Sequence, residues 1–252
     1  MSLSLGKNPL RDSRNSLDRF LLYADEIVHR WNGNGIAVCV RSEDERSQLE
    51  SFLVESRFPS RLNVTIVVDP SEHYPINHLR NVAIQGVHTS HFFLTDIDLW
   101  PASDLYETIK DLPKEILEIQ NQAIVIPAYE VNYNSKQFRV LENTRVSNRR
   151  KDGVCLDLEK CWFRHLFLVP HHRMELMSCL KYGPCERFKE QQLTHTSTDY
   201  DRWESITNHS EYLFDVECFK NEGYEPYVVV KRDSSLHILI EHDLGFLHFT
   251  FI

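Results

Sequence analysis

Helical and strand patterns alternate within residues 17–68, and this alternation limits the fold more than any other feature of the sequence. Apolar residues recur at helical spacing from Leu17 to Trp31, and the run Asn32–Gly35 ends that helix. The short apolar stretch Ile36–Val40 comes next and predicts a buried strand. One helix and one strand are therefore expected before residue 41.

The same pair of patterns is then repeated. Ser42, with Glu45 three residues later, is typical of a capping box and opens a helix that ends before Pro59. The stretch Leu62–Val68 is rich in β-branched residues and predicts the next buried strand. Because parallel neighbours need a crossover of this length, we expect an α/β fold with a mixed, mostly parallel sheet flanked by helices.

A third helix is expected after Pro75, followed by a strand at His91–Thr95. One face of this helix would hold Asn77, Arg80 and Asn81 side by side, because residues three and four apart are neighbours on a helix. An arginine in such a position can make a bidentate contact with a phosphate group.

Two aspartates one residue apart, Asp96 and Asp98, come at the carboxyl end of that strand, and Pro101 breaks the strand pattern soon afterwards. In open α/β sheets, ligands bind beyond the carboxyl ends of strands. Carboxylate oxygens bind Mg²⁺ or Mn²⁺, and such a metal neutralises the charge that develops when a sugar leaves a nucleotide diphosphate. Asp96 and Asp98 are therefore the predicted metal ligands.

The chain holds a second triplet of the same form, Asp199-Tyr200-Asp201. It follows the polar run 194–198, so no apolar strand presents it at the edge of a sheet. We interpret this copy as the start of a helix or as a loop.

Composition excludes several classes of protein. The formal net charge of -9 over 252 residues argues against a nucleic-acid-binding surface, which needs a clustered excess of Lys and Arg. The sequence contains no apolar run long enough to cross a bilayer and no pattern typical of a signal peptide, so the chain as written is expected to be soluble.

The cysteines leave the cellular compartment open. None of the six forms a Cys-x-x-Cys pair or a tight Cys/His cluster, so a structural zinc site is not predicted. An even number of cysteines fits disulfides in a secretory lumen, and buried free thiols explain it equally well. Asn63-Val64-Thr65 and Asn208-His209-Ser210 match the acceptor sequence for N-glycosylation, which has meaning only in the secretory pathway.

Four ordered blocks resemble one known family. The first runs from Tyr74-Pro-Ile-Asn-His-Leu-Arg-Asn-Val-Ala83 through Phe92-Phe-Leu-Thr-Asp-Ile-Asp-Leu-Trp-Pro101 to Asp104-Leu-Tyr106. The others are Ala123-Ile-Val-Ile-Pro-Ala-Tyr-Glu130, Thr198-Asp-Tyr-Asp-Arg-Trp203 and Tyr224-Glu-Pro-Tyr-Val-Val-Val230. Together they resemble the LARGE-type glucuronyltransferases, glycosyltransferase family 49.

This resemblance implies a single GT-A-like domain over residues 1–252, with a nucleotide-binding half at about 15–130 and an incomplete acceptor-side half at about 131–252. It implies a UDP-sugar donor, glucuronic acid as the sugar, Mn²⁺ or Mg²⁺ as the metal, a glycan or glycoprotein acceptor, inversion at the anomeric carbon, and work in the Golgi lumen. The residues carried over are Asp96 and Asp98 for the metal, Asn77, Arg80, Asn81 and Asp96 for the nucleotide, and Glu225 and Tyr227 for the acceptor side.

The sequence departs from the family at both ends. In place of the family's first apolar strand, Met1–Arg14 supplies only Leu3-Ser-Leu5, and the family's membrane anchor is missing. After Asp233 the chain skips the family's glycine- and aromatic-rich loop and lacks the histidine that completes the metal shell. An inverting transfer needs a base to take the acceptor proton, and no spacing selects among the carboxylates in plausible regions, which are Glu130, Asp215, Glu225 and Asp233.

Three functions of different class follow. The first is an active metal-dependent glycosyltransferase, favoured by Asp96, Asp98 and Arg80. The second is an inactive or truncated relative that binds a nucleotide, a glycan or a protein, favoured by the missing blocks. The third, a phosphatase or nuclease, fits less well because those enzymes draw dispersed acidic ligands around two metals.

Overall fold

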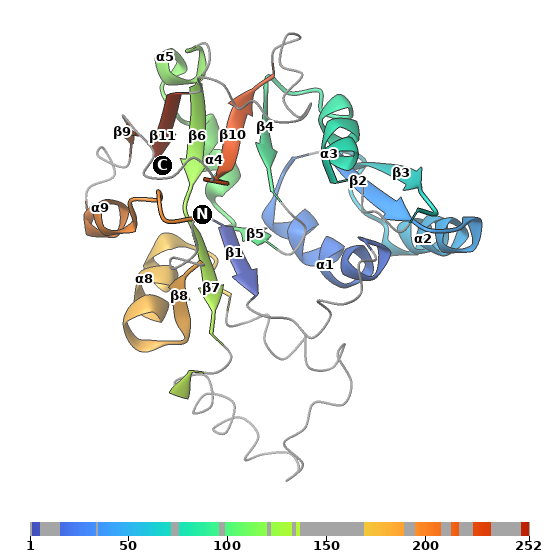
Figure 1. Ribbon diagram of the computed structural model, residues 1–252, viewed down its shortest axis with the longest axis horizontal. Helices are drawn as coiled ribbons and strands as arrows, with labels where there is room; N and C mark the ends of the chain where they lie inside the picture. The colour runs from blue at the N-terminus through green and yellow to red at the C-terminus, as the bar shows by residue number, and fades with distance from the viewer. Residues whose placement is uncertain are drawn as a thin grey trace.

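The computed structural model describes residues 2–5, 16–33, 35–71, 76–95, 99–119, 122–132, 135–136, 169–188, 195–207, 213–216, 224–232 and 248–251. Strands and helices alternate through the first 94 residues, as Figure 1 shows. The helices are α1 (Ser16–Arg30), α2 (Glu43–Ser56), α3 (Ile76–Gln85), α4 (Leu105–Lys110), α5 (Lys114–Leu117), α8 (Arg173–Tyr182) and α9 (Tyr200–Ser205). The strands are β1 (Ser2–Leu5), β2 (Gly35–Val40), β3 (Asn63–Val68), β4 (His91–Leu94), β5 (Leu99–Pro101), β6 (Gln122–Ile126), β7 (Ala128–Val131), β8 (Cys185–Arg187), β9 (Phe214–Val216), β10 (Tyr227–Lys231) and β11 (His248–Phe251).

The described strands form three groups. The largest has the order β4-β10-β6-β11-β9, a second has the order β5-β1-β7-β8, and β2 pairs with β3 alone. The chain passes from the first group into the second twice, once between β4 and β5 and once between β6 and β7. In the second passage a single residue, Pro127, separates the two strands. Proline cannot donate a hydrogen bond to the ladder, so it breaks the strand at this point.

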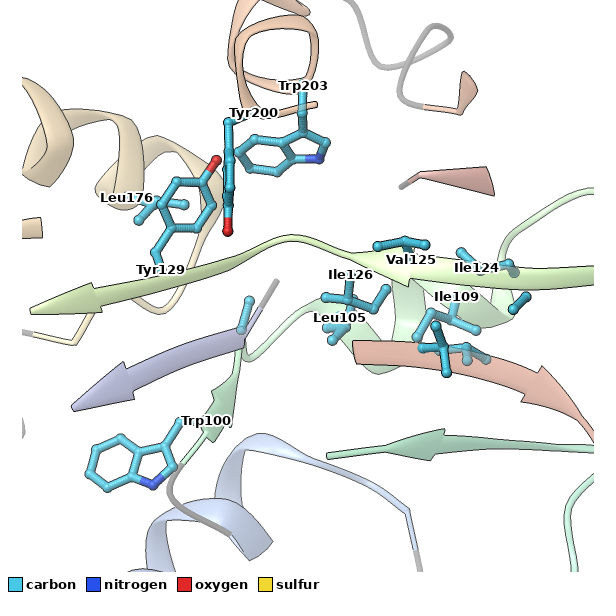
Figure 2. Packing of buried hydrophobic residues seen from close by; sticks show 14 of the residues in the cluster. Trp100, Leu105, Ile109, Ile124, Val125, Ile126, Tyr129, Leu176, Tyr200 and Trp203 are labelled. Atoms are coloured by element: carbon cyan, nitrogen blue, oxygen red, sulfur yellow. The ribbon is translucent and has the colours of Figure 1, made fainter. Parts of the chain in front are cut away.

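Two apolar clusters hold these groups together. The smaller lies where α1 and α2 cover β2, and it is built from Leu17, Phe20, Ala24, Val38, Val40 and Leu49. The larger surrounds β6 and β7, whose residues 123–129 are all buried. Figure 2 shows Tyr129, Tyr200 and Trp203 on one side of this continuous run, with Ile126 and Leu105 on the other. The β6–β7 run is therefore covered on both faces, as its uninterrupted apolar sequence requires.

The local predictions for the N-terminal part of the chain are confirmed. The helix begun at Leu17, the strand at Ile36, the capped helix before Pro59 and the strand before Asp69 appear as α1, β2, α2 and β3. The Ser42 hydroxyl accepts from the Glu45 amide at 3.2 Å, and the Glu45 carboxylate accepts from the Arg41 amide at 2.6 Å. Both contacts satisfy amides at the start of α2, where the helix itself offers no acceptors.

The prediction of a mostly parallel sheet is wrong for the described strands. The pairs β2–β3, β1–β7 and β11–β6 are parallel, whereas the other five of the eight pairings are antiparallel. The helical crossover of α2 correctly predicts β2–β3. It carries no information about β10, which arrives from more than 90 residues downstream of β6 and inserts antiparallel between β4 and β6.

Candidate functional site

The predicted metal ligands fall between β4 and β5. Asp96 and Asp98 themselves lie outside the described residues, and the structure defines what stands on either side of them. Leu94 of β4 pairs with Val228 of β10, and Leu99 of β5 pairs with Ser4 of β1. The segment 96–98 thus connects two sheets, and β5 is a short strand of its own that ends at the expected Pro101.

Helix α1 anchors both flanks of this segment. Trp31, directly after α1, packs against Phe93 of β4 with 5.4 Å between ring centroids. Tyr23 packs edge-on against Trp100 of β5 at 5.9 Å, and the guanidinium of Arg30 lies over the same indole at 5.5 Å. Aromatic pairs of this kind add about 0.5–1.5 kcal/mol beyond the area they bury. The positions at which residues 96–98 leave β4 and enter β5 are therefore held by one helix.

Arg30 also ties this region to the start of α8. Only 3% of its surface is exposed, and its Nη1 and Nη2 atoms donate to the carbonyls of Pro170 at 3.0 Å and Val169 at 3.3 Å. Nη2 lies 3.1 Å from Nε2 of His171, whose Nδ1 lies 2.8 Å from the Ser103 hydroxyl. Arginine only donates, so Nε2 of His171 accepts and its ring proton is on Nδ1. Burial, followed by the Arg30 charge, lowers the pKa of His171.

The start of β10 lies at the same edge as the carboxyl ends of β4 and β6. Tyr227 pairs with Ile126, and Val228 pairs with Leu94. Continuing that register by one residue puts the backbone of Tyr227 beside Thr95, which immediately precedes Asp96. Glu225 is exposed two residues before Tyr227. Tyr227, one of the two predicted acceptor-side residues, therefore has its backbone beside the residue that precedes Asp96.

Two side chains that the sequence did not single out complete an aromatic cluster here. The ring of His195 stacks on Tyr227 at 6.0 Å with 16° between the planes, and Phe188 contacts His195 edge-on at 4.8 Å. Phe188 also lies 6.1 Å from Tyr227. His195 is 5% exposed. It belongs to a polar run without apolar periodicity, so no local signal marks it as buried.

Tyr224 is held near this cluster by a hydrogen bond. Its hydroxyl lies 2.9 Å from the Thr198 hydroxyl, and burial raises its pKa although the Thr198 contact acts in the opposite direction. The block 224–230 and the block 198–203 are therefore joined in space, as expected of two parts of one site.

The candidate bases are only partly placed. Glu130 pairs with Ser4, and Ser4 pairs with Leu99, so the Glu130 backbone is two strands, or about 10 Å, from the residue after Asp98. Asp215 is exposed on β9, which is separated from β10 by β11 and β6. Asp233 lies outside the described residues.

The predicted nucleotide residues lie on α3, which packs against β2 and β3. Arg80 and Asn81 are both partly exposed, and the backbone of Asn77 is in the first turn of the helix. The side chain of Asn77 lies outside the described residues, so the expected grouping of all three stays a prediction.

The second Asp-x-Asp triplet has a structural role, as predicted. Asp199 is the N-cap of α9, and its side chain accepts from the Arg202 amide at 3.1 Å. Asp201 pairs with Arg187. Arg187 also donates to both carboxylate oxygens of Glu204 at 2.9 Å, and the Tyr129 hydroxyl donates to Glu204 at 3.3 Å. Burial, then the Glu204 charge, raises the pKa of Tyr129.

Among the residues that the structure describes, no three His, Cys, Asp or Glu side chains are grouped to hold a metal ion. Asp96 and Asp98 lie outside those residues, and their paired carboxylates are the donors that Mg²⁺ and Mn²⁺ take. The chemistry of this donor set fits such a metal. In the described part of the chain, helices are also too short or too polar to traverse a bilayer.

Comparison with known proteins agrees with the four sequence blocks. Residues 38–238 match the sequence model of the family described as "Glycosyl-transferase for dystroglycan". The chain is 28% identical over 243 residues to the xylosyl- and glucuronyltransferase LARGE2s of Danio rerio and to LARGE1 of Homo sapiens, covering 93% of this chain and 26% of each relative. It is 29% identical over 226 residues to LARGE2 of Mus musculus, covering 86% of this chain and 27% of that protein.

The chain thus spans about a quarter of the length of the curated relatives it matches. The family match itself covers most of the chain, including both flanks of residues 96–98 and the aromatic cluster at Tyr227. The chain therefore belongs to glycosyltransferase family 49, the family that its sequence blocks resemble.

Proposed function

We propose that this chain transfers a sugar from a UDP-sugar to a glycan or glycoprotein acceptor, with Asp96 and Asp98 holding Mn²⁺ or Mg²⁺. The observation that carries this proposal is how the residues on either side of 96–98 are held. Strand β4 ends beside Tyr227, β5 begins beside β1, and α1 packs on both flanks through Phe93 and Trp100. A metal site needs carboxylates whose supporting backbone is held in place, and these contacts supply that support.

The donor would lie between α3 and the β4–β5 connection. Arg80 and Asn81, with Asn77, are proposed to contact the nucleotide phosphates, because a guanidinium binds phosphate oxygens in a bidentate manner. A bound divalent metal would neutralise charge on the leaving diphosphate. GT-A architecture over residues 1–252, with a nucleotide half and an acceptor half that meet near residue 130, is part of this proposal.

The acceptor would approach from the side of β10. Tyr227 is partly exposed and packs on the buried rings of Phe188 and His195, and an aromatic face packs well against the C–H surface of a pyranose. Glu225 is exposed next to this cluster and Glu130 lies two strands from Leu99, so each is a candidate for accepting the acceptor proton. Asp233 is the third candidate.

Glucuronic acid as the transferred sugar, inversion at the anomeric carbon and action in the Golgi lumen complete the proposal. The first two rest on the family, whose similar members are named xylosyl- and glucuronyltransferases. Inversion requires one base on the face of the sugar opposite the leaving diphosphate. One of the three candidate carboxylates would fill this role.

Donor binding is tested first by thermal unfolding of the full chain. UDP at ~100 times its dissociation constant, with Mn²⁺ in excess, should add about 2.7 kcal/mol of stability and raise the melting temperature by roughly 5–10 °C. UDP without metal and uridine with metal are the controls. An unchanged melting temperature with UDP and excess Mn²⁺ would mean that the chain is an inactive relative.

Transfer is tested by UDP release from UDP-glucuronic acid, with UDP-xylose and UDP-glucose as matched donors and a panel of short glycans as acceptors. We expect metal-dependent release that increases when the correct acceptor is added. The anomeric configuration of the product, read by NMR, should be opposite to that of the donor. Retention would contradict the assignment of a single base.

A further inference from the structure

Asn63 is the exposed asparagine of an N-glycosylation acceptor sequence on a strand. It is the first residue of β3 and belongs to the triplet Asn63-Val64-Thr65. Val64 and Ile66 pack into the apolar cluster beneath α1 and α2, so strand alternation turns Asn63 and Thr65 to the opposite face. Asn63 itself is exposed, whereas Thr65 is partly buried.

The Asn63 amide lies close to the end of α3. A Cβ atom placed on Gly86 would lie 3.2 Å from the Asn63 Nδ2 atom, closer than most side-chain contacts. Glycine at position 86 keeps this space open. The Nδ2 atom, which is the atom that N-glycosylation modifies, therefore lies beside the last turn of α3 and is not covered by a side chain from Gly86.

Among the strands that the structure describes, the outer side of β3 is a sheet edge. Within the described residues β3 pairs with β2 alone, in parallel register from Gly35 and Asn63 to Val40 and Val68. Unpaired strand edges can pair with another chain and cause aggregation, so proteins cover them. In Figure 1 the β2–β3 pair lies at the side of the molecule, away from the large sheet.

A separate observation indicates the compartment in which the chain folds. Cys179 in α8 and Cys185 at the start of β8 form a disulfide, with 5.3 Å between their Cα atoms. Structural disulfides form and persist in oxidising compartments. N-glycosylation of an Asn-x-Thr acceptor also belongs to the secretory pathway. The disulfide is far in sequence from Asn63, so the two observations are independent.

We propose that Asn63 carries an N-linked glycan that covers the outer edge of β3. In this modification the Asn63 Nδ2 atom loses a proton and forms a bond to C1 of the first sugar. The C1–O bond to the lipid diphosphate carrier breaks, and the lipid diphosphate leaves. The proposal does not depend on whether the chain transfers sugars itself.

Peptide mass spectrometry tests the modification. The full chain is produced in cultured animal cells behind an added, cleavable secretion signal, digested with trypsin, and treated with peptide N-glycosidase in ¹⁸O-water. We expect the peptide from Leu62 to Arg80 to contain ¹⁸O-labelled aspartate at position 63. The same sample without reduction should contain the linked peptides of Cys179 and Cys185.

Matched variants separate glycosylation from folding. Thr65→Ser keeps the acceptor sequence and should keep the label, whereas Thr65→Ala and Asn63→Gln should lose it. An Asn208→Gln control should leave the label at residue 63 unchanged. An unlabelled wild-type peptide in a sample that contains the disulfide would overturn the proposal.

Aggregation on mild heating tests what the glycan does. The Asn63→Gln chain should form more large species on size-exclusion chromatography than the Thr65→Ser chain, which retains the glycan. Equal aggregation of the two secreted chains would overturn the edge-covering role.

Discussion

Two triplets of identical form, Asp96-Ile97-Asp98 and Asp199-Tyr200-Asp201, have different surroundings in this chain. In the second triplet both carboxylates are taken up by the fold, because Asp199 caps α9 and Asp201 pairs with Arg187. The first triplet lies between two strands of different sheets, with its flanks packed on α1. What precedes a triplet, a buried strand or a polar run, therefore separates a candidate metal site from a helix cap.

The sharpest test of this difference replaces one carboxylate in each triplet. Asp98→Asn should weaken metal-dependent UDP binding by at least ~100-fold with the fold intact, because it removes a proposed direct ligand. Asp201→Asn should leave UDP affinity unchanged. Titration calorimetry with Mn²⁺ present measures both, and equal UDP affinity in Asp98→Asn and wild type would remove the metal assignment.

A smaller effect is expected from the helix that precedes the first triplet. Arg80→Ala should weaken UDP by roughly 10-fold and uridine much less, because a charge-assisted hydrogen bond to phosphate is absent in the nucleoside. Arg46→Ala is a suitable control, since Arg46 lies on neighbouring α2 and pairs with Glu50. Similar losses for UDP and uridine would contradict a phosphate contact.

The second triplet should affect stability instead of binding. Asp199→Ala removes the side-chain cap of α9 and should cost about 1 kcal/mol, which lowers the melting temperature by roughly 2–4 °C in a chain of this size. Asp199→Ser retains a capping oxygen and should recover most of that loss. A loss of UDP binding in Asp199→Ala, at a temperature where it is folded, would break the comparison.

The smallest effect concerns the contact between Arg30 and His171. The pKa of His171 is lowered in the fold by burial and by Arg30, so the unfolded chain takes up the proton first as pH falls. Its contribution to stability is present above the ordinary pKa of 6.5 and is lost as pH falls below that value and through the lower pKa of the folded chain. Urea unfolding at pH 7.5 and 5.5 should show a larger loss for wild type than for His171→Gln. If the stability of both chains depends equally on pH, the Arg30–His171 contact does not contribute in this way.

Much of the N-terminal half could be predicted because its elements are local. The helical spacing from Leu17, the cap at Ser42 and the β-branched stretch before Asp69 each specify an element from nearby residues alone. The disulfide could not be predicted in the same way, because six cysteines allow many pairings and only the fold brings Cys179 and Cys185 together. The candidate site is predictable only in part for a related reason. Arg30 donates hydrogen bonds to the carbonyls of Val169 and Pro170, about 140 residues away. No neighbouring residue in the sequence predicts that contact.

The family, the local helices and strands, and the Asp-x-Asp triplet that follows a buried strand could all be predicted from sequence, because each depends on the order and spacing of neighbouring residues. Two features became visible only in the folded chain. Strand β10 inserts antiparallel between β4 and β6, and the ring of His195 stacks on Tyr227. Long-range pairing depends on which surfaces exclude water together when the whole chain collapses, and the local pattern of a strand is the same whichever partner it finds.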